Sequence, residues 1–418
     1  MTFIQEKFDI AVIGGGPAGI MAAIKAGESG ARVVLLEKNN NLGKKLLLTG
    51  NGRCNLTHAE FNHKMFANEF GKNGDFLMSG FSVFGPKETM DFFEKKGLKL
   101  KTERGKRVFP QSDKASDVLN ILDKYLKKNN VVVVHGCKIS GLRSKDKNIT
   151  SIVLQGKEKL IAQKYILATG GKSYTQTGST GDGFIWAKKL GHNVSKLRPA
   201  LVPLKVKEKW IKNLQGLGLK NIELSVFQDN KKKDSKFGEM MFTHLGISGP
   251  IVLGLSKNVA VLLEKNNVDL VLDLKPKLNF QELDKRIQHD FAKYQNKLFR
   301  NCLKDLLPSK IIPVIIMLSG IDPSKKVNRI TKQERQSLLN LLKGLKMTAT
   351  GTLKLDKAIV TNGGISVKEI ESKTMRSKLF NNLYFAGEII DLDGPSGGYN
   401  LQLCWTSGYL AGMAAAKV

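Results

Sequence analysis

Cysteine is scarce in this chain, and its spacing does not suggest a metal or disulfide framework. Only four cysteines occur among 418 residues, at positions 54, 137, 302 and 404, and no two are spaced as C-x-x-C. Cys54 with His58 and His63 could be written as a metal motif, but the spacing is unlike that of zinc sites. We therefore predict no metal, no disulfide scaffold, and a reducing cytoplasmic environment.

Long apolar runs are also missing. The run from Ile311 to Leu318 contains Pro313 and is far shorter than the ~20 residues that span a bilayer. The segment 10–26 is mostly apolar, but Glu6 and Asp9 precede it, and its glycine spacing is unlike that of a signal peptide. We expect neither a transmembrane span nor export.

Acidic residues are few relative to basic ones. The chain has 37 Asp and Glu residues and 67 Lys and Arg residues, which gives a net charge of +30. Its hydrophobic content of 41% excludes a disordered chain. Solubility needs only a few units of charge, and a bound dinucleotide offsets about two. Residues 1–194 carry +14, residues 195–355 carry +16, and 356–418 are neutral, so a coding bias towards Lys explains only part of the excess. The charge favours a polyanionic partner such as RNA, although no common RNA-recognition motif is present.

A dinucleotide-binding pattern lies near the N-terminus. An apolar strand at 8–13 precedes Gly14-x-Gly16-x-x-Gly19, a helix of small residues follows to Ser29, and a second strand ends at Glu37. In such a βαβ unit the glycines permit a tight turn, close approach to a pyrophosphate and close helix packing. Helix amides then hold the phosphates, and the acid accepts from ribose hydroxyls. A glycine-rich turn without a ligand is the alternative, which this context disfavours.

Two later segments favour FAD over NAD as that dinucleotide. Ala168-Thr169-Gly170-Gly171 ends a predicted strand, where a backbone crossing near a cofactor needs glycine. Near the C-terminus, Ala386-Gly387-Glu388 ends another strand, and Gly397-Gly398-Tyr399-Asn400 opens the last helix, whose amides would stabilise an anionic reduced flavin. A second G-x-G-x-x-G is absent, so we expect NAD(P)H to bind only transiently.

The pattern changes in the middle of the chain. Short alternating runs at 200–273 predict a small β-barrel or sandwich, and 280–345 has helical spacing. We therefore predict an α/β fold, a Rossmann-like FAD-binding domain (1–194 plus 356–418) interrupted by a β-barrel insertion (195–275) and a helical insertion (276–355).

Several motifs together resemble one known family. They are Leu46-Leu-Leu-Thr-Gly-Asn-Gly-Arg-Cys-Asn-Leu-Thr57, Gly178-Ser-Thr-Gly-Asp-Gly183, Phe242-Thr-His-Leu-Gly-Ile-Ser-Gly-Pro250, Phe385-Ala-Gly-Glu-Ile-Ile-Asp-Leu-Asp-Gly394 and Gly397-Gly-Tyr-Asn-Leu-Gln402. With them the chain resembles the bacterial BaiN/YhiN-like FAD-dependent oxidoreductases from residue 8 to 416. The resemblance implies an FAD domain with barrel and helical insertions. It implies activities that include reduction of conjugated C=C bonds in steroid-like acids, an amine-oxidase-like activity, and dihydrouridine formation in 23S ribosomal RNA. Cys404 departs from the small apolar residue that is usual there.

The fingerprints and the resemblance together give a set of predicted site residues. The predicted cofactor-binding residues are Gly14, Gly16, Ala18, Gly19, Glu37, Lys38, Lys45, Gly50, Asn51, Gly52, Arg53, Ala168, Thr169, Gly170, Gly387, Glu388, Gly398, Tyr399, Asn400 and Leu401. The predicted catalytic residues are Cys54, Arg53 and His244.

Each of these roles has a structural alternative. A thiol at Cys54 beside Arg53 would have thiolate character and relay a proton, or else be a small packed residue. Arg53 would steady an anionic substrate or the flavin, or be salt-bridged. His244 would be an acid, or a hydrogen-bonded structural histidine. Lys44 and Lys45 would face FAD phosphate or RNA, or be exposed.

Three functions fit these expectations. The first is an FAD-dependent reductase, driven by NAD(P)H, that converts a uridine of 23S ribosomal RNA to dihydrouridine; hydride from flavin N5 would enter C6 of the conjugated C5=C6 bond. The second is a small-molecule enone reductase or amine oxidase. The third is an RNA-binding protein with a structural FAD. In the first, Lys231–Lys233, Lys325, Lys326 and Arg329 are the predicted RNA contacts of the insertions. The sequence does not predict an oligomeric state.

Overall fold

A computed structural model describes residues 7–417 of the chain. The chain forms two compact units, each with its own hydrophobic core. Unit 1 comprises the residues up to Arg198 and those from Leu355 onward, and unit 2 is Pro199–Lys354. Unit 2 is therefore an insertion in the sequence of unit 1.

Unit 1 is built around a parallel five-stranded sheet of order β19-β10-β1-β2-β6. Its strands are short, apolar and mostly buried, as expected for a sheet covered on both faces. They are β1 (Phe8–Ile13), β2 (Val33–Leu36), β6 (Val132–Val134), β10 (Ala162–Leu167) and β19 (Leu383–Phe385). Ile13 pairs with both Leu36 and Leu167, and Leu167 pairs with Phe385, so the carboxyl ends of four strands meet at one edge. In parallel sheets that edge carries the ligand sites.

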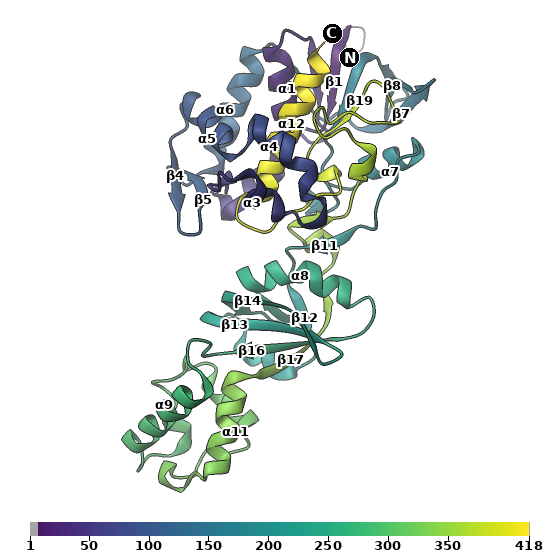
Figure 1. Cartoon of the computed structure of the whole chain (residues 1–418). Coiled ribbons are helices and arrows are strands. Elements are labelled where there is room, and N and C mark those ends of the chain that lie inside the picture. The colour runs from purple at the N-terminus through teal and green to yellow at the C-terminus, as the bar shows by residue number, and fades with distance from the viewer. Residues whose placement is uncertain (1–6, 418) are drawn as a thin grey trace. The chain divides into compact units, whose positions relative to one another are not determined.

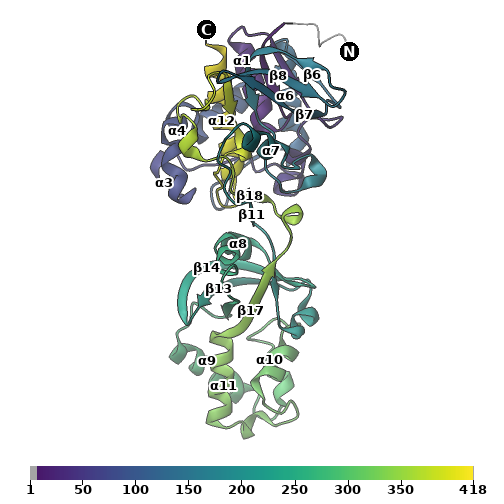
Figure 2. The ribbon, with the colours of Figure 1, turned by 90° about the vertical axis from the view of Figure 1, so that its right-hand side faces the viewer.

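The first and last helices of unit 1, α1 (Pro17–Glu28) and α12 (Tyr399–Ala416), lie side by side in both Figure 1 and Figure 2. Small residues allow this close approach. A Cβ on Gly408 would lie 2.3 Å from the carbonyl oxygen of Ala18, and one on Gly412 would lie 2.3 Å from that of Ala22. The α12 glycines therefore fix how the end of the chain packs on its beginning.

The remaining elements of unit 1 surround this core. Further helices are α2 (Lys44–Leu48), α3 (His63–Asn68), α4 (Met78–Phe84), α5 (Pro86–Lys95), α6 (Ala115–Lys128) and α7 (Asp182–Lys189). A small sheet has the order β3-β5-β4, with β3 (Thr57–His58), β4 (Leu100–Glu103) and β5 (Arg107–Pro110), and another has the order β7-β8-β9, with β7 (Ile139–Lys145), β8 (Asn148–Leu154) and β9 (Lys159–Leu160). β18 (Val360–Asn362) is a further short strand of unit 1, and β11 (Arg198–Ala200) spans the sequence boundary between the two units.

Unit 2 contains a closed six-stranded barrel and a helical segment. The barrel order is β12-β15-β14-β13-β16-β17, with β12 (Leu204–Val206), β13 (Gly218–Gln228), β14 (Lys231–Phe242), β15 (Gly246–Ser248), β16 (Val268–Asp273) and β17 (Leu345–Thr352). The other elements are α8 (Pro250–Leu262), α9 (Phe280–Lys293), α10 (Ile312–Ser319) and α11 (Lys332–Lys343), the last three of which gather below the barrel in Figure 2.

The predicted α/β fold with a Rossmann-like domain and a barrel is confirmed. One boundary differs from the prediction. The last barrel strand, β17, lies in the range that we assigned to the helical insertion. The helical segment therefore interrupts the barrel between β16 and β17, since β17 pairs with both β16 and β12.

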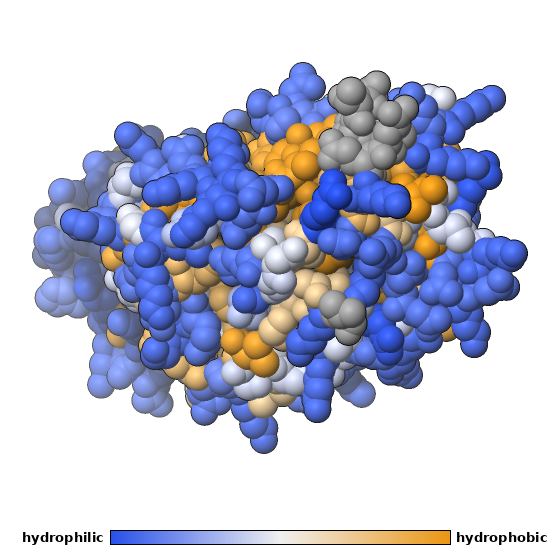
Figure 3. Space-filling view, turned by 90° about the horizontal axis from the view of Figure 1, so that it is seen from above, coloured by the Kyte–Doolittle hydropathy of each residue, from blue (hydrophilic) through white to orange (hydrophobic). Residues whose placement is uncertain are grey.

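The surface in Figure 3 consists mainly of hydrophilic residues, with apolar residues visible only in limited areas between them. Among residues 7–417, no helix combines the length and apolar character needed to cross a bilayer.

Candidate dinucleotide and flavin site

The glycine-rich turn lies between β1 and α1 and has the geometry that a dinucleotide site needs. Gly14 has φ +108°, and a Cβ there would lie 2.4 Å from the carbonyl oxygen of Ala168. A Cβ on Gly19 would lie 1.9 Å from the carbonyl oxygen of Gly14. At Gly16, by contrast, a Cβ would meet no atom within 4 Å. The turn thus leaves open space in front of α1, where a pyrophosphate approaches in Rossmann folds.

Glu37 at the end of β2 braces this turn. Its Oε2 accepts a hydrogen bond from the Gly15 amide (2.7 Å), and its Oε1 accepts from the backbone amide and side chain of Asn39 (2.8 and 2.6 Å). The carboxylate is largely buried. Because each carboxylate oxygen has two lone pairs, acceptor capacity is left for a ribose hydroxyl, as the sequence predicts for Glu37.

The Ala168-Thr169-Gly170 segment ends β10 beside the glycine turn. Gly170 has φ +71°, which favours glycine at that position. The Thr169 hydroxyl is buried and has no hydrogen-bond partner among residues 7–417. Buried hydroxyls are nearly always paired, so this oxygen is of the kind that a bound ligand satisfies.

Lys45 and Glu388 form a half-buried ion pair in the same unit. Lys45 Nζ lies 2.8 Å from Glu388 Oε2 and 2.7 Å from Ser173 Oγ. Glu388 Oε1 accepts from Ser173 Oγ (2.8 Å) and from the Thr361 amide (2.7 Å). Burial opposes ionisation of Glu388, but Lys45 and these donors outweigh it and hold its pKa below the ordinary value. The carboxylate therefore stays charged, and the Lys45 ammonium is held in place.

The segment that opens α12 is tied to the segment after α2. Gly398 caps the helix with φ +103°, and a Cβ on it would lie 2.3 Å from the carbonyl oxygen of Thr57. Tyr399 is buried, and its ring stacks on His58 with 4.5 Å between centroids. Asn400 holds the preceding turn, since its amide exchanges hydrogen bonds with the backbone of Gly394 and Pro395 (2.8–3.1 Å). Leu401 is half-buried against the core.

The loop Gly50–Cys54 is unusually rich in left-handed conformations. Gly50, Asn51, Gly52 and Cys54 all have positive φ, and the first three are exposed. A Cβ on Gly52 would meet no atom within 4 Å. The predicted cofactor contacts of residues 50–52 remain predictions, which this exposed backbone permits.

The predicted thiolate at Cys54 is wrong. The side chain has 0% exposure, and burial raises the pKa of its thiol to about 12. The neighbouring Arg53 does not offset this burial, because its guanidinium is paired elsewhere with Glu103 and Asp113 and lies over the Phe109 ring, 4.1 Å from its centroid. A fully covered thiol does not reach a substrate. The alternative reading, a small packed residue, describes Cys54.

Arg53 is likewise not free to steady a substrate. It forms ion pairs with Glu103 and Asp113, and these two hydrogen-bonded carboxylates raise the pKa of its guanidinium. The predicted role as an anion-binding residue is therefore replaced by the salt-bridged alternative, in which Arg53 ties the loop to the β4–β5 hairpin.

The other predicted residues lie in different parts of the structure. Lys38 pairs with Asp182 (2.9 Å) and with Thr180 (2.6 Å) at the start of α7, and Lys44 reaches the Asn39 side chain at 3.3 Å. Ala18 is buried beneath Gly387, where the added Cβ would lie 2.8 Å from that of Ala18. His244 belongs to unit 2 and is exposed between β14 and β15. Its predicted acid role remains a prediction.

Sequence reasoning missed a buried polar network that supports α12. Gln402 accepts from Thr57 Oγ1 (2.6 Å) and donates to Thr89 Oγ1 (2.8 Å), and Trp405 donates to the Leu56 carbonyl (2.9 Å). Gln402 stood within the quoted family motif, which was the only signal for it. No sequence signal indicated the roles of Ser173 and Thr361, because Glu388, to which both donate hydrogen bonds, is distant from them in the sequence.

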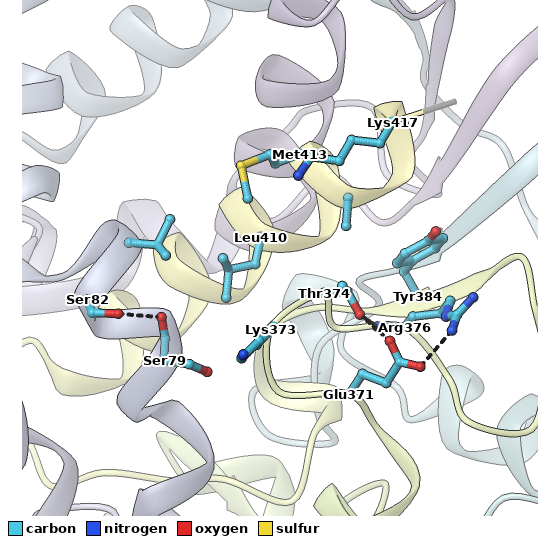
Figure 4. A pocket seen from close by; sticks show the side chains of 12 residues that line it. Ser79, Ser82, Glu371, Lys373, Thr374, Arg376, Tyr384, Leu410, Met413 and Lys417 are labelled. Carbon is cyan, nitrogen blue, oxygen red and sulfur yellow. Dashed lines mark hydrogen bonds and ion pairs between the residues drawn. The ribbon is translucent and has the colours of Figure 1, made fainter.

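A cavity of about 550 Å³ in unit 1 lies elsewhere (Figure 4). Met413 lines it from the last turns of α12, and Arg376 and Glu371, hydrogen-bonded at 2.7 Å, line it from the segment before β19. The predicted cofactor residues of α12 end at Leu401, roughly 18 Å away along a helix that rises 1.5 Å per residue. This cavity therefore lies apart from the candidate site.

The residues present fit an FAD molecule. Both α1 and α12 begin without a side-chain cap, so their first amides are available to a ligand at the two places where the sequence predicts phosphate and flavin. The open space at Gly16 and the orphaned Thr169 hydroxyl support the same assignment. Among residues 7–417, no group of His, Cys, Asp or Glu is arranged to hold a metal ion.

Comparison with known proteins gives the family. The model of the HI0933-like protein Rossmann domain matches residues 8–414. A 3-dehydro-bile acid delta(4,6)-reductase of Clostridium scindens is 33% identical over 98% of this chain and 99% of its own. A ribosomal RNA dihydrouridine synthase of Escherichia coli is 28% identical over 97% of both chains.

A solved structure extends the comparison to the fold. A 3-ketosteroid-delta4-(5alpha)-dehydrogenase of Rhodococcus jostii shares it with a TM-score of 0.54, at 16% identity, over 100% of this chain and 99% of that one. The family resemblance found in the sequence is confirmed: the chain belongs to the HI0933-like Rossmann family and is an FAD-dependent oxidoreductase.

Proposed function

We propose that this oxidoreductase reduces a uridine of 23S ribosomal RNA to dihydrouridine, with NAD(P)H as reductant, in the cytoplasm. The observation that carries the proposal is the net charge of +30, which a small acidic substrate does not require. Relatives of 27% and 28% identity that are matched over nearly their whole length are named ribosomal RNA dihydrouridine synthases.

The reaction needs a hydride, a proton and an exposed base. The hydride is the chemistry that FAD would supply at this site when bound and reduced. C6 of uracil accepts the hydride because C5=C6 is conjugated to the C4 carbonyl, and C5 then takes a proton. A base in folded RNA must first be unstacked, which costs a few kcal/mol, and a basic surface offsets part of that cost.

The described residues serve this chemistry by binding and charge stabilisation. The uncapped first turns of α1 and α12 leave amides that would hold negative charge, of a pyrophosphate at α1 and of a flavin at α12. The Lys45 ammonium, held by Glu388 and Ser173, adds a fixed positive charge in unit 1. Whereas Cys54 is covered, the exposed His244 of unit 2 keeps, as a proposal, its predicted role as an acid. Its replacement by Gln should lower the rate at least about 100-fold and leave FAD binding unchanged.

Nucleoside mass spectrometry tests the proposal directly. We expect 23S RNA from a strain that lacks the gene to lose dihydrouridine, and the purified enzyme with NADPH to restore it to that RNA. NADH in a parallel reaction identifies the preferred reductant. RNA that keeps its full dihydrouridine content in the deletion strain would refute the assignment.

A small-molecule enone reductase is the second candidate. It is favoured by the relative of 33% identity, which is named a bile acid reductase. Both reactions reduce an alkene conjugated to a carbonyl, so the same flavin site serves either. Turnover of a free steroid-like enone, together with ligand binding that does not depend on salt, would favour this candidate over RNA. Flavin that NAD(P)H and RNA never cycle would instead indicate an RNA-binding protein with a structural cofactor.

A further inference from the structure

The helical segment of unit 2 brings two basic stretches of sequence together. Leu298 and Lys326 form an antiparallel bridge, extended by hydrogen bonds from Phe299 N to Lys325 O (2.9 Å) and from Val327 N to Lys297 O (3.0 Å). Paired extended segments lie about 5 Å apart. Residues 295–300 and 323–329 therefore share one edge of the segment, although some 28 positions separate them in the sequence.

Four cations of this edge have no carboxylate partner among residues 7–417. They are Lys297, Arg300, Lys326 and Arg329, and all four are exposed. We call them the basic edge. The Lys297 ammonium lies over the Tyr294 ring, 4.7 Å from its centroid, which restricts its motion.

Acidic residues near the basic edge are mostly neutralised. Asp305 pairs with Lys293 (2.7 Å), and Glu334 pairs with Lys325 (2.7 Å). Asp322 is exposed and bonds the Ser324 amide, so it offsets one charge of the edge. The net surplus is about three positive charges on a small surface, within a range, 276–355, that holds 16 basic and 6 acidic residues.

The other predicted RNA contact is less suitable. In the β13–β14 hairpin, Lys232 pairs with Glu223 at 3.2 Å. Asp229, Asp234 and Glu239 also lie in or next to this hairpin. Alternating charge of this kind is typical of a solvated turn. The charge surplus therefore lies on the helical segment rather than on the hairpin.

We infer that the basic edge is a docking surface for the phosphate backbone of structured RNA. This inference rests on the proposed function and adds where the RNA is held. Several unpaired cations on one edge match a row of phosphates, and such contacts position a nucleic acid without reading its sequence. The edge thus supplies affinity, whereas unit 1 carries the flavin chemistry.

The test is a quadruple variant, Lys297→Gln, Arg300→Gln, Lys326→Gln and Arg329→Gln, in the full-length flavoprotein. Its matched control removes the same charge from unit 1 at four exposed lysines of the β7–β8–β9 sheet, Lys145→Gln, Lys147→Gln, Lys157→Gln and Lys159→Gln. Binding of transcribed 23S RNA is measured between 50 and 200 mM salt, roughly the range over which phosphate contacts are lost. Flavin absorbance and circular dichroism confirm that each variant is folded.

We expect the basic-edge variant to bind RNA at least about tenfold more weakly, with the slope of log K against log salt reduced by about three, since each phosphate contact contributes about 0.7 to 0.9. The control should change affinity by less than about threefold. Equal losses in the two variants, or no loss in the first, would overturn the inference. The inference would also be overturned if the basic-edge variant lost binding to anionic phospholipid vesicles but kept binding to RNA, since that result would identify a membrane site.

Dihydrouridine formation separates this inference from the proposed function. If wild type forms dihydrouridine and the basic-edge variant binds RNA normally, the inference fails and the function stands. If the variant loses RNA binding but wild type forms no dihydrouridine, the function fails and the docking surface stands.

Discussion

Lys45 and Glu388 form an ion pair of 2.8 Å although 343 positions separate them in the sequence. The pair links the segment after β2 to the segment after β19, and both side chains are mostly covered, with 22% and 16% exposure. It is therefore a long-range tie inside unit 1 whose loss leaves one charge poorly solvated.

Replacement of either partner should destabilise unit 1. We expect Lys45→Met and Glu388→Gln each to lower the free energy of unfolding by about 2 kcal/mol, and the double variant to lose less than the sum. Urea unfolding of the four proteins measures this coupling. The exposed pair Lys87–Asp91 on α5 is the control, and we expect no measurable coupling there. Strict additivity at Lys45 and Glu388 would contradict the predicted tie.

Gly16 and Gly19 should separate cofactor binding from folding. Gly16→Ala adds a methyl group to open space at an ordinary φ of −84°, so the apoprotein should unfold at the wild-type temperature. Its FAD affinity should fall about tenfold or more, because the methyl group occupies the approach of the pyrophosphate. Gly19→Ala forces backbone to shift and should cost about 1–3 kcal/mol in the apoprotein. Flavin titration and thermal unfolding measure both, and normal FAD affinity in Gly16→Ala would refute the site.

His192 should make unit 1 less stable in mild acid. Its ring is buried, bonded to Glu369 and Ser377 at 3.1 Å each, and burial lowers its pKa although Glu369 acts in the opposite direction. The unfolded chain binds a proton below about pH 6.5, whereas the folded protein keeps the ring neutral. Stability is thus complete above about pH 6.5 and falls as the pH is lowered.

His192→Gln is the variant for this effect. It should lower stability at pH 7.5 by about 1–3 kcal/mol, through the lost hydrogen bonds, and flatten the loss between about pH 6.5 and 5. Urea unfolding at several pH values measures both. Part of the slope should persist, because burial also lowers the pKa of His58. An unchanged slope in His192→Gln would contradict the assignment.

Cys54→Ala should leave catalysis nearly intact. The thiol is covered and protonated, so its removal should change the rate of NAD(P)H-driven flavin turnover by less than about threefold. Native Cys54 should also resist a thiol reagent until the protein unfolds. Rapid labelling at neutral pH, or a large loss of turnover in Cys54→Ala but not in Cys302→Ala, would restore a chemical role for this residue.

The sequence predicted the parts of the site that depend on local backbone geometry. Gly14, Gly16 and Gly19 were identified because a turn from strand to helix imposes its requirements within six residues. The β-strand that ends at Leu167 was likewise predicted from its run of apolar residues. The close approach of Gly14 to Ala168 agrees with the interpretation of both segments.

The sequence did not predict which neighbours neutralise or cover a side chain. Arg53 adjoins Cys54, which suggested that its charge acts on the thiol. Instead, Glu103 at the end of β4 and Asp113 after β5 lie at the guanidinium, and the positive φ of Cys54 accompanies a buried thiol. The partners of Arg53 are 50 and 60 positions away in the sequence. The periodicity of apolar residues does not predict contacts of this kind.

The contact of Gly408 and Gly412 with α1 has a consequence for biosynthesis. All of unit 2 leaves the ribosome before α12 is made, so the barrel can fold on the nascent chain while the N-terminal helix still lacks its neighbour. Until translation passes residue 412, the face of α1 that packs on α12 stays uncovered, so unit 1 completes its folding after the barrel.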